Sequence, residues 1–154
     1  MCSRTCCKHT KELLGPDFYR ILDANFNRAK EGLRVCEEIA RFHLRQAQIT
    51  KKLRFLRHRL TVILKNSGIN QAELFSSRDS EKDLGRNFKG CTPRKSFRGI
   101  FMANAQRVKE SLRVLEEFLK TTKKSSSQDI QKLRFIFYDL EKKAVEQYPD
   151  LLDS

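Results

Sequence analysis

Apolar residues recur every three or four positions along four stretches of the chain, which is the spacing of amphipathic helices. Two stretches carry six such positions each: Leu22, Phe26, Ala29, Leu33, Cys36 and Ala40, then Phe101, Ala105, Val108, Leu112, Leu115 and Leu119. Two others carry five each: Ile49, Leu53, Leu56, Leu60 and Ile63, then Ile130, Leu133, Phe137, Leu140 and Ala144. The pattern predicts long helices at about 17–45 and 96–121, each followed by a second helix that ends near 66 and 147.

The two long stretches are copies of one sequence. Residues 103–117 repeat residues 24–38 at an offset of 79, with ten of the fifteen positions identical. The helices that follow carry a weaker echo, in which the Leu-Arg-Phe run at 53–55 returns at 133–135. Short connections make the two helices of each copy antiparallel. We therefore expect an all-α fold in which two repeated antiparallel helical hairpins form a four-helix bundle with pseudo-two-fold symmetry.

A single helical domain accounts for most of the chain. We expect a flexible basic tail at 1–14 and a domain at 15–149, divided into repeat A at 17–66, a central loop at 67–95 and repeat B at 96–147. The central loop is longer than most connections in helical bundles, and such loops tend to be functional or disordered. We interpret it as an ordered loop that closes over a site; the alternative is a plain linker.

The residues that the two copies share are mostly polar, whereas the apolar stripe keeps only Leu33 and its counterpart Leu112. The shared polar pairs are Asn25/Asn104, Arg28/Arg107, Lys30/Lys109, Glu31/Glu110, Arg34/Arg113, Glu37/Glu116 and Glu38/Glu117. One explanation is a set of salt links along each helix, worth only tenths of a kcal/mol each. Because many Glu and Arg combinations would serve that purpose, we favour a ligand-binding face present in both copies.

The net charge is +13 at pH 7, from 32 Lys and Arg against 19 Asp and Glu. This excess either serves solubility or indicates an anionic partner, of which nucleic acid is the usual one. However, Arg alternates with Glu within the repeats, and Glu repels a phosphate backbone. The mixture favours a small phosphorylated ligand with a metal ion over a nucleic acid. The phosphate-binding and nucleophile motifs of common enzyme families are missing, so any active site must be built from helical side chains and the central loop.

The five cysteines are an odd number without a regular framework, which favours a reduced, cytoplasmic setting. There is no apolar run of membrane-spanning length and no secretory signal after Met1, so we expect neither a membrane partner nor export. Cys2, Cys6, Cys7 and His9 are either a metal cluster or part of a frayed tail, and the second is favoured because no further ligand pair follows at finger spacing. Cys36 lies on the apolar stripe and is expected to be a small core residue.

Several segments resemble one known family, the strictly monofunctional hydroxymethylpyrimidine-phosphate kinases of bacterial thiamine biosynthesis. They are the run at 20–35, the run at 53–60, Ser77-Arg78-Asp79 with Asp83-Leu84-Gly85, the second copy at 103–117, and 133–138. The resemblance covers about residues 17–145. One departure is the stretch 79–83, where Thr and more apolar residues would be expected.

The resemblance implies ATP-dependent phosphorylation of 4-amino-5-hydroxymethyl-2-methylpyrimidine phosphate to its diphosphate, with Mg²⁺. Members of this family are often fused to a thiamine-phosphate synthase barrel, which is absent here. Association with a separate thiamine-phosphate synthase, or an oligomer of this chain, is compatible with the sequence. Because the barrel carries the synthase activity in such fusions, the name thiamine-phosphate synthase would describe the fusion partner and not this chain.

Residue chemistry suggests roles within such a reaction. Guanidinium groups that can hold phosphates are Arg28, Arg34, Arg78, Arg107 and Arg113. Asn25 and Asn104 could recognise the aminopyrimidine edge, and Glu31 and Glu110 could hold Mg²⁺ among the phosphates. Asp79 is the candidate for orienting or deprotonating the attacking phosphate. His58 is the second candidate catalytic residue, and the alternative is a surface histidine without a role in the reaction.

Two alternatives to the kinase come from other functional classes. One is a non-catalytic basic helical module that binds nucleic acid or an anionic partner, whose affinity would fall steeply with salt. The other is a regulatory subunit that keeps the fold without turnover. The Glu residues interspersed in the repeats favour the enzyme over the first alternative.

Overall fold

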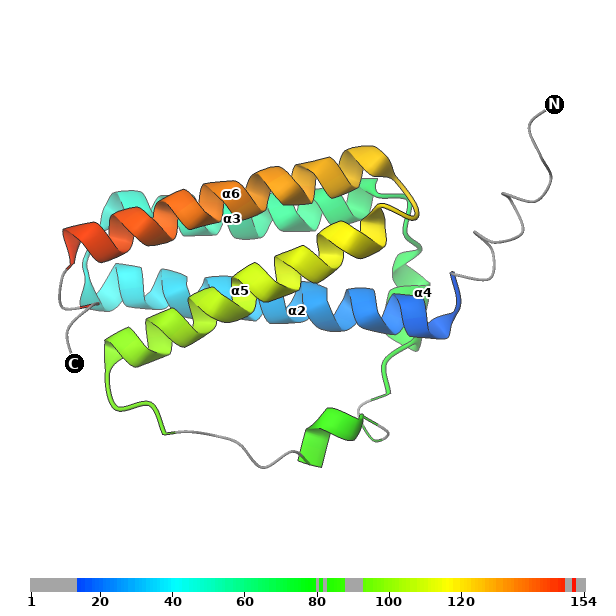
Figure 1. Ribbon diagram of the computed structural model, residues 1–154, viewed down its shortest axis with the longest axis horizontal. Coiled ribbons are helices and arrows are strands. Elements are labelled where there is room, and N and C mark those ends of the chain that lie inside the picture. Colours follow the sequence, from blue (N-terminus) through cyan, green and yellow to red (C-terminus); the bar gives the residue numbers. More distant parts are fainter. Residues whose placement is uncertain (1–13, 80, 82, 88–92, 149–150, 152–154) are drawn as a thin grey trace.

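The computed structural model describes residues 14–79, 81, 83–87, 93–148 and 151 (Figure 1). Within them the chain forms five α-helices, a π-helical turn and a 3-10 turn, with no strand. In chain order these elements are α2 (Pro16–Glu38), the π turn η1 (Ile39–His43), α3 (Ala47–Asn66), α4 (Gln71–Ser76), the 3-10 turn η2 (Leu84–Asn87), α5 (Phe97–Leu119) and α6 (Lys124–Gln147). The expected tail at 1–14 and its residues Cys2, Cys6, Cys7 and His9 lie outside the described residues, apart from Leu14.

Helix ends follow local sequence signals. Pro16 opens α2 with Asp17 in the first turn, where a missing N–H costs nothing and a negative charge is favourable. Ser96 caps α5 by accepting a hydrogen bond from the Gly99 N–H at 3.1 Å. After α3 the chain turns at Gly68, whose φ of 80° suits glycine.

The four long helices form two antiparallel hairpins, α2 with α3 and α5 with α6. The hairpins pack with α2 against α5 and α3 against α6, and Figure 1 shows α2 and α5 running in opposite directions. The expected all-α helical bundle is therefore confirmed, and the two-fold relation between the hairpins stays a prediction. No helix of the described part of the chain is long and apolar enough to cross a membrane.

The core is built from the four apolar stripes. Every stripe residue of the four helices is buried except Phe26, which is only partly buried. Cys36 is fully buried, and this burial, together with the nearby Glu141 carboxylate, raises the pKa of its thiol to about 12. The thiol therefore stays protonated at neutral pH and packs as a small core residue, as its place on the stripe predicts.

The predicted helix at 17–45 is not one regular helix. α2 ends at Glu38 and continues into η1, in which the Leu44 N–H bonds the Ile39 carbonyl at 3.0 Å, a five-residue step. In the second copy α5 stays α-helical to Leu119. The central loop at 67–95 contains two short helical elements, and the first of them, α4, packs against α2.

At Gly32 the helices α2 and α5 lie close together. A Cβ atom there would lie 2.8 Å from the Cγ2 of Val108 and 3.0 Å from the backbone oxygen of Asn104. Real Cβ atoms are not found at 2.8 Å from another heavy atom, so any larger residue would push the two helices apart. The counterpart of Gly32 in the second copy is Ser111, which is also small and buried.

We expect Gly32→Ala to lower the free energy of unfolding by about 1 kcal/mol. Overpacking against Val108 costs about 1–3 kcal/mol, and the better helix propensity of alanine offsets up to about 1 kcal/mol of it. Urea denaturation monitored by circular dichroism measures the difference. Ser111→Ala is the matched control and should change stability less, because it adds no atom to the seam. An alanine variant at Gly32 that is as stable as the parent would contradict the close approach.

Candidate functional site

A polar cavity of about 550 Å³ lies between α2 and α5, beside their close contact at Gly32. We call it the polar cavity; its lining residues are Asn25, Arg28, Glu31, Gly32, Asn104, Arg107, Glu110, Ser111 and Val114. Eight of them form four pairs related by the offset of 79. Thus each copy of the repeat contributes the same kinds of side chain to one cavity.

The two asparagines are held in the same way. The amide nitrogen of Asn25 donates to the Ile21 carbonyl at 2.9 Å, and that of Asn104 donates to the Ile100 carbonyl at 2.8 Å. Each bond fixes the side-chain amide against its own helix. The amide oxygens are therefore available as acceptors beside the cavity, for example for an exocyclic amino group of a ligand.

The charged groups of the polar cavity are two guanidiniums and two carboxylates, so their formal charges cancel. Within the described residues, Arg28, Arg107 and Glu31 form no ion pair and no hydrogen bond through their side chains, while Glu110 accepts one from Gln106 at 2.8 Å. Five other arginines of the repeats pair with carboxylates: Arg34, Arg54, Arg57, Arg113 and Arg134. The cavity therefore combines cationic groups that can hold phosphate with anionic groups that can hold a cation.

The remaining shared pairs have a different role. Arg34 pairs with Glu38 at 2.7 Å, and its counterpart Arg113 pairs with Glu117 at 2.8 Å. Neither Arg34 nor Arg113 lines the polar cavity. Both explanations for the polar residues shared by the two copies thus apply. Salt links along the helix explain the arginine and glutamate pairs of this paragraph, and a common cavity explains the pairs that line the polar cavity.

Glu37 is fully buried and anchors the first hairpin. Its carboxylate accepts hydrogen bonds from the Nε atoms of Arg54 at 3.1 Å and Arg57 at 3.2 Å, both on α3. Two guanidiniums compensate one buried carboxylate, which offsets the cost of removing its charge from water. The two ion pairs therefore link α2 to α3 and penalise any packing of the two helices that separates them.

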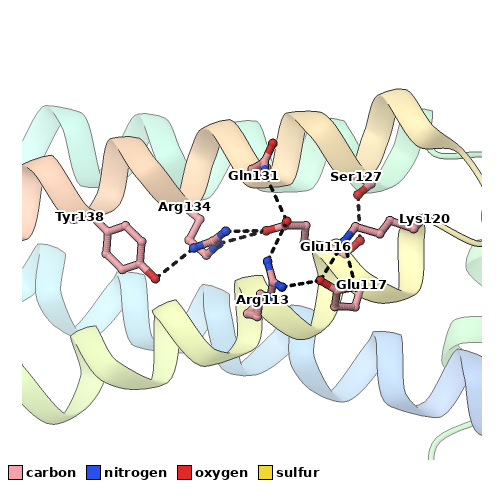
Figure 2. A network of polar contacts seen from close by, with 8 residues as sticks. All are labelled: Arg113, Glu116, Glu117, Lys120, Ser127, Gln131, Arg134 and Tyr138. Atoms are coloured by element: carbon pink, nitrogen blue, oxygen red, sulfur yellow. Dashed lines mark hydrogen bonds and ion pairs between the residues drawn. The ribbon is translucent and has the colours of Figure 1, made fainter.

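Glu116, the counterpart of Glu37, anchors the second hairpin in the same manner. It is 1% exposed and pairs with Arg134 of α6 at 2.9 Å and with Arg113 at 3.1 Å (Figure 2). Gln131 and the hydroxyl of Ser127 complete the network, with bonds to the Glu116 side chain and backbone oxygen. Arg113 thus pairs with Glu116 from within α5, whereas Arg134 links Glu116 to α6.

Two neighbours of this network have shifted pKa values. The hydrogen bond to Tyr138 and the ion pair with Glu116 raise the pKa of Arg134 against the opposing effect of burial. The hydrogen bond from Lys120, assisted by the charge of Arg113, lowers the pKa of Glu117. Both shifts favour the charged forms that the network requires.

The candidates from the central loop and from α3 lie outside the lining of the polar cavity. Arg78 makes a bidentate bridge to the buried Asp23 of α2, with Nε–Oδ2 and Nη2–Oδ1 distances of 2.7 and 2.9 Å. The backbone oxygen of Asp79 accepts a hydrogen bond from Arg20 at 2.7 Å. His58 is exposed on α3. The Arg78 bridge thus links the central loop to α2. The substrate-binding role of Arg78 and the catalytic roles of Asp79 and His58 stay predictions.

Two carboxylates in the polar cavity are placed where they could bind a metal ion. Glu31 and Glu110, the predicted Mg²⁺ ligands, line the same cavity. Among the described residues no group of three or more His, Cys, Asp or Glu side chains is clustered as a complete metal site would require. Two carboxylates nevertheless fit Mg²⁺ when substrate phosphates and water supply the other ligands.

Three lining residues were not predicted: Gly32, Ser111 and Val114. The signal for the first two was available, because the repeat keeps a small residue at both positions while the surrounding stripe changes. Asp23, the partner of Arg78, has Met102 as its counterpart and carries no repeat signal.

Comparison with known proteins adds a family to this geometry. Residues 20–143 match the model of the ThiD2 family. Similar curated proteins include the thiamine-phosphate synthases of Nostoc sp. (38% identical over 125 residues, 80% of this chain and 34% of the relative) and of Nostoc punctiforme (37% over 133 residues, 85% and 36%). That of Rhodopirellula baltica is 37% identical over 121 residues, 77% of this chain and 32% of the relative. The chain spans about a third of the length of these relatives, and no solved structure matches it significantly.

We expect Glu116→Ala to lower the free energy of unfolding by about 3–5 kcal/mol, because removing one partner of a buried ion pair leaves Arg134 uncompensated. Thermal and urea unfolding measure the loss. Glu117→Ala is the matched control: it removes the same side chain one residue later, where the side chain is 43% exposed, and should change stability much less. Equal effects of the two substitutions would show that the network does not support the hairpin.

Proposed function

The chain belongs to the ThiD2 family, and from this membership we propose that it acts in thiamine biosynthesis as a phosphotransferase. The proposed reaction uses ATP to convert 4-amino-5-hydroxymethyl-2-methylpyrimidine phosphate into its diphosphate. The observation that carries the proposal is the polar cavity, where the same asparagine, arginine and glutamate are supplied by both α2 and α5. The names of the similar curated proteins support the pathway.

In this reaction the bond between the γ-phosphorus of ATP and its bridging oxygen breaks. A new bond forms between that phosphorus and an oxygen of the pyrimidine's phosphate, and ADP leaves. Catalysis of such a transfer is mostly positioning and charge neutralisation. Arg28 and Arg107 are suited to hold the two reacting phosphates, since guanidinium groups bind phosphate oxygens in pairs.

The acceptor needs little help from a base. A phosphate monoester has a second pKa of about 6, so its oxygens are largely deprotonated at neutral pH. The polar cavity is lined by asparagine, arginine and glutamate rather than by histidine. This composition suits an acceptor that is already an anion better than it suits an alcohol, which must lose a proton.

Glu31 and Glu110 are the proposed ligands of Mg²⁺, which would neutralise charge on the phosphates when bound. Asn25 and Asn104, whose amide oxygens remain available, would accept hydrogen bonds from the amino group of the pyrimidine. Asp79 and His58 are not among the residues that line the polar cavity, so the proposal does not depend on either of them acting as a base. A separate thiamine-phosphate synthase is the expected protein partner.

The alternative of a nucleic-acid-binding module is less favoured. Two of the four charged groups in the polar cavity are carboxylates, which would repel a phosphate backbone. The high net charge of +13 is distributed elsewhere and provides solubility or attraction for small anions. A binding module would show weak, strongly salt-dependent affinity for any polyanion and no turnover.

The direct experiment is to incubate the purified chain with ATP, Mg²⁺ and the pyrimidine monophosphate, and to follow the diphosphate by phosphorus NMR. We expect the product to form, and to disappear when Mg²⁺ is chelated. The double variant Glu31→Gln with Glu110→Gln should need a much higher Mg²⁺ concentration. Product formation at an unchanged rate without any divalent cation would remove both glutamates from the assignment.

We expect Arg28→Ala and Arg107→Ala each to lower kcat/KM by about 10²–10³, the usual cost of deleting one charge-stabilising group in an active site. The melting temperature should change little, because neither guanidinium has a partner among the described residues. Arg59→Ala, on the exposed side of α3, is the matched control and should keep full activity. Turnover close to that of the parent in both cavity variants would favour a purely structural role for the shared arginines.

The substrate should be the monophosphate and not the free alcohol. Without its phosphate the pyrimidine would leave Arg28 or Arg107 without a counter-ion, and sites reject analogues that leave a polar group unpaired by about 10⁴-fold in favourable cases. The measurement compares initial rates for both compounds at equal concentration, with ATP and Mg²⁺ saturating. Comparable rates on the alcohol would show that the arginines do not select the acceptor.

A further inference from the structure

A second cavity, of about 420 Å³, lies between the end of α2 and the start of α5. We call it the aromatic pocket, because most of its walls come from the apolar and aromatic side chains of Val35, Ile39, Phe42, His43 and Phe97. Nothing in the reaction described above uses it. Apolar cavities of this size with a few polar groups are typical ligand sites.

The pocket is created by the π turn. In η1 the chain takes one extra residue per turn, and Phe42 and His43 lie in this turn. The imidazole of His43 stacks on the ring of Phe97 at the start of α5, with centroids 4.1 Å apart and ring planes at 20°. Single π turns inside helices occur frequently at functional sites.

The corresponding end of the other copy of the repeat is built differently. The counterparts of Phe42 and His43 are Thr121 and Thr122, and α5 stays α-helical up to Leu119. The counterpart of Phe97 is Phe18, which is 3% exposed and packs against Phe118 with ring centroids 5.7 Å apart. The contact between α2 and α5 is therefore filled by buried aromatic rings at the end with Phe18 and Phe118, whereas the end with Phe97 is open at the aromatic pocket.

The open end exposes two phenylalanine rings to solvent. Phe42 is 62% exposed and Phe97 is 53% exposed. Adjacent large aromatic groups left in contact with water indicate a binding surface. Flat rings stack on such faces, and for a base on an aromatic side chain the contact is worth about 1–3 kcal/mol.

The position of the aromatic pocket beside the polar cavity indicates which ligand it binds. Gly32 lines the polar cavity and Arg34 lines the aromatic pocket, so the two cavities follow each other along α2. From Arg28 to Glu38 the helix rises by about 15 Å. A ribose with a chain of phosphates can cover this span, whereas the single phosphate ester of the pyrimidine cannot.

We propose that the aromatic pocket binds the adenine ring of ATP, with the phosphates extending along α2 into the polar cavity. This inference rests on the proposed function and specifies how the nucleotide lies in the same site. The ion pair between Arg34 and Glu38, both lining the pocket, supplies a donor and an acceptor side by side. Adenine presents the complementary pair, an exocyclic amino group next to a ring nitrogen.

The first test uses fluorescence. The chain contains no tryptophan, so a Phe42→Trp variant carries a single reporter in the pocket. ADP should quench its emission, and tripolyphosphate, which lacks the ring, should not. Phe55→Trp is the matched control on α3, because Phe55 is similarly exposed at 55% and lies away from both cavities. Equal responses of the two variants to ADP would overturn the proposal.

The second test measures affinity by calorimetry. Phe42→Ala and Phe97→Ala should each weaken ADP binding about tenfold or more, and the Phe55→Ala control should not. Tripolyphosphate affinity should stay unchanged in all three variants. Phe42 is more than half exposed, so its alanine variant decides the question if Phe97→Ala fails to fold. Unchanged ADP affinity in Phe42→Ala, a loss of pyrimidine monophosphate binding in its place, or no ADP binding by the parent chain would each overturn the proposal.

The outcomes separate this inference from the proposed function. If ADP binding depends on Phe42 but no pyrimidine diphosphate is formed, the result supports the aromatic pocket as the adenine site and contradicts the proposed kinase reaction. If the diphosphate is formed while Phe42→Ala and Phe97→Ala bind ADP like the parent, the kinase stands and the aromatic pocket is not its adenine site.

Discussion

The close contact of α2 and α5 at Gly32 is the constraint on which the rest of the structure depends. Because this residue has no side chain, α5 can approach until the Asn104 carbonyl oxygen and a methyl group of Val108 leave too little room for a Cβ atom. The polar cavity lies at this approach, lined from both helices. A wider spacing would separate the two arginines and the two glutamates of the cavity. The core and the candidate site therefore share one packing requirement.

Buried ion pairs within each hairpin support this geometry. Glu37 and Glu116 are buried at equivalent positions of the repeat, and each is paired with guanidinium groups of the neighbouring helix of its hairpin. Such pairs contribute little net stability compared with apolar packing, but they penalise any arrangement that leaves the carboxylate unpaired. They fix the register of each hairpin, and so the direction in which Arg28 and Arg107 project.

Most of the fold could be predicted from the sequence because the helical period is regular and occurs in two copies. The six cavity residues Asn25, Arg28, Glu31, Asn104, Arg107 and Glu110 could also be predicted, since they keep their identity while the core changes. The sequence could not separate them from Arg34 and Arg113, which are shared for a different reason. That distinction depends on where the helices cross, and a one-residue step in the stripe moves a side chain to another face.

The rest of the site depends on interactions that leave no repeated signal. The partnership of Arg78 with Asp23 joins residues 55 positions apart, and neither has a counterpart of the same type in the other copy. The π turn that places Phe42 and His43 depends on one extra residue in a helix whose apolar pattern looks continuous. The positions of Asp79 and His58 relative to the cavity follow from the path of the chain and from the face of α3, which composition does not determine.

The bridge from Arg78 to Asp23 also divides the connection between the hairpins into two lengths. Without it, the chain from Asn66 at the end of α3 to Phe97 at the start of α5 closes as one loop of 31 residues; with it, 19 residues follow the anchor. Since closure entropy grows with the logarithm of loop length, this shortening is worth only about 0.4 kcal/mol. The bridge thus contributes mainly direction, by setting the point on α2 from which the connecting segment leaves toward the second hairpin.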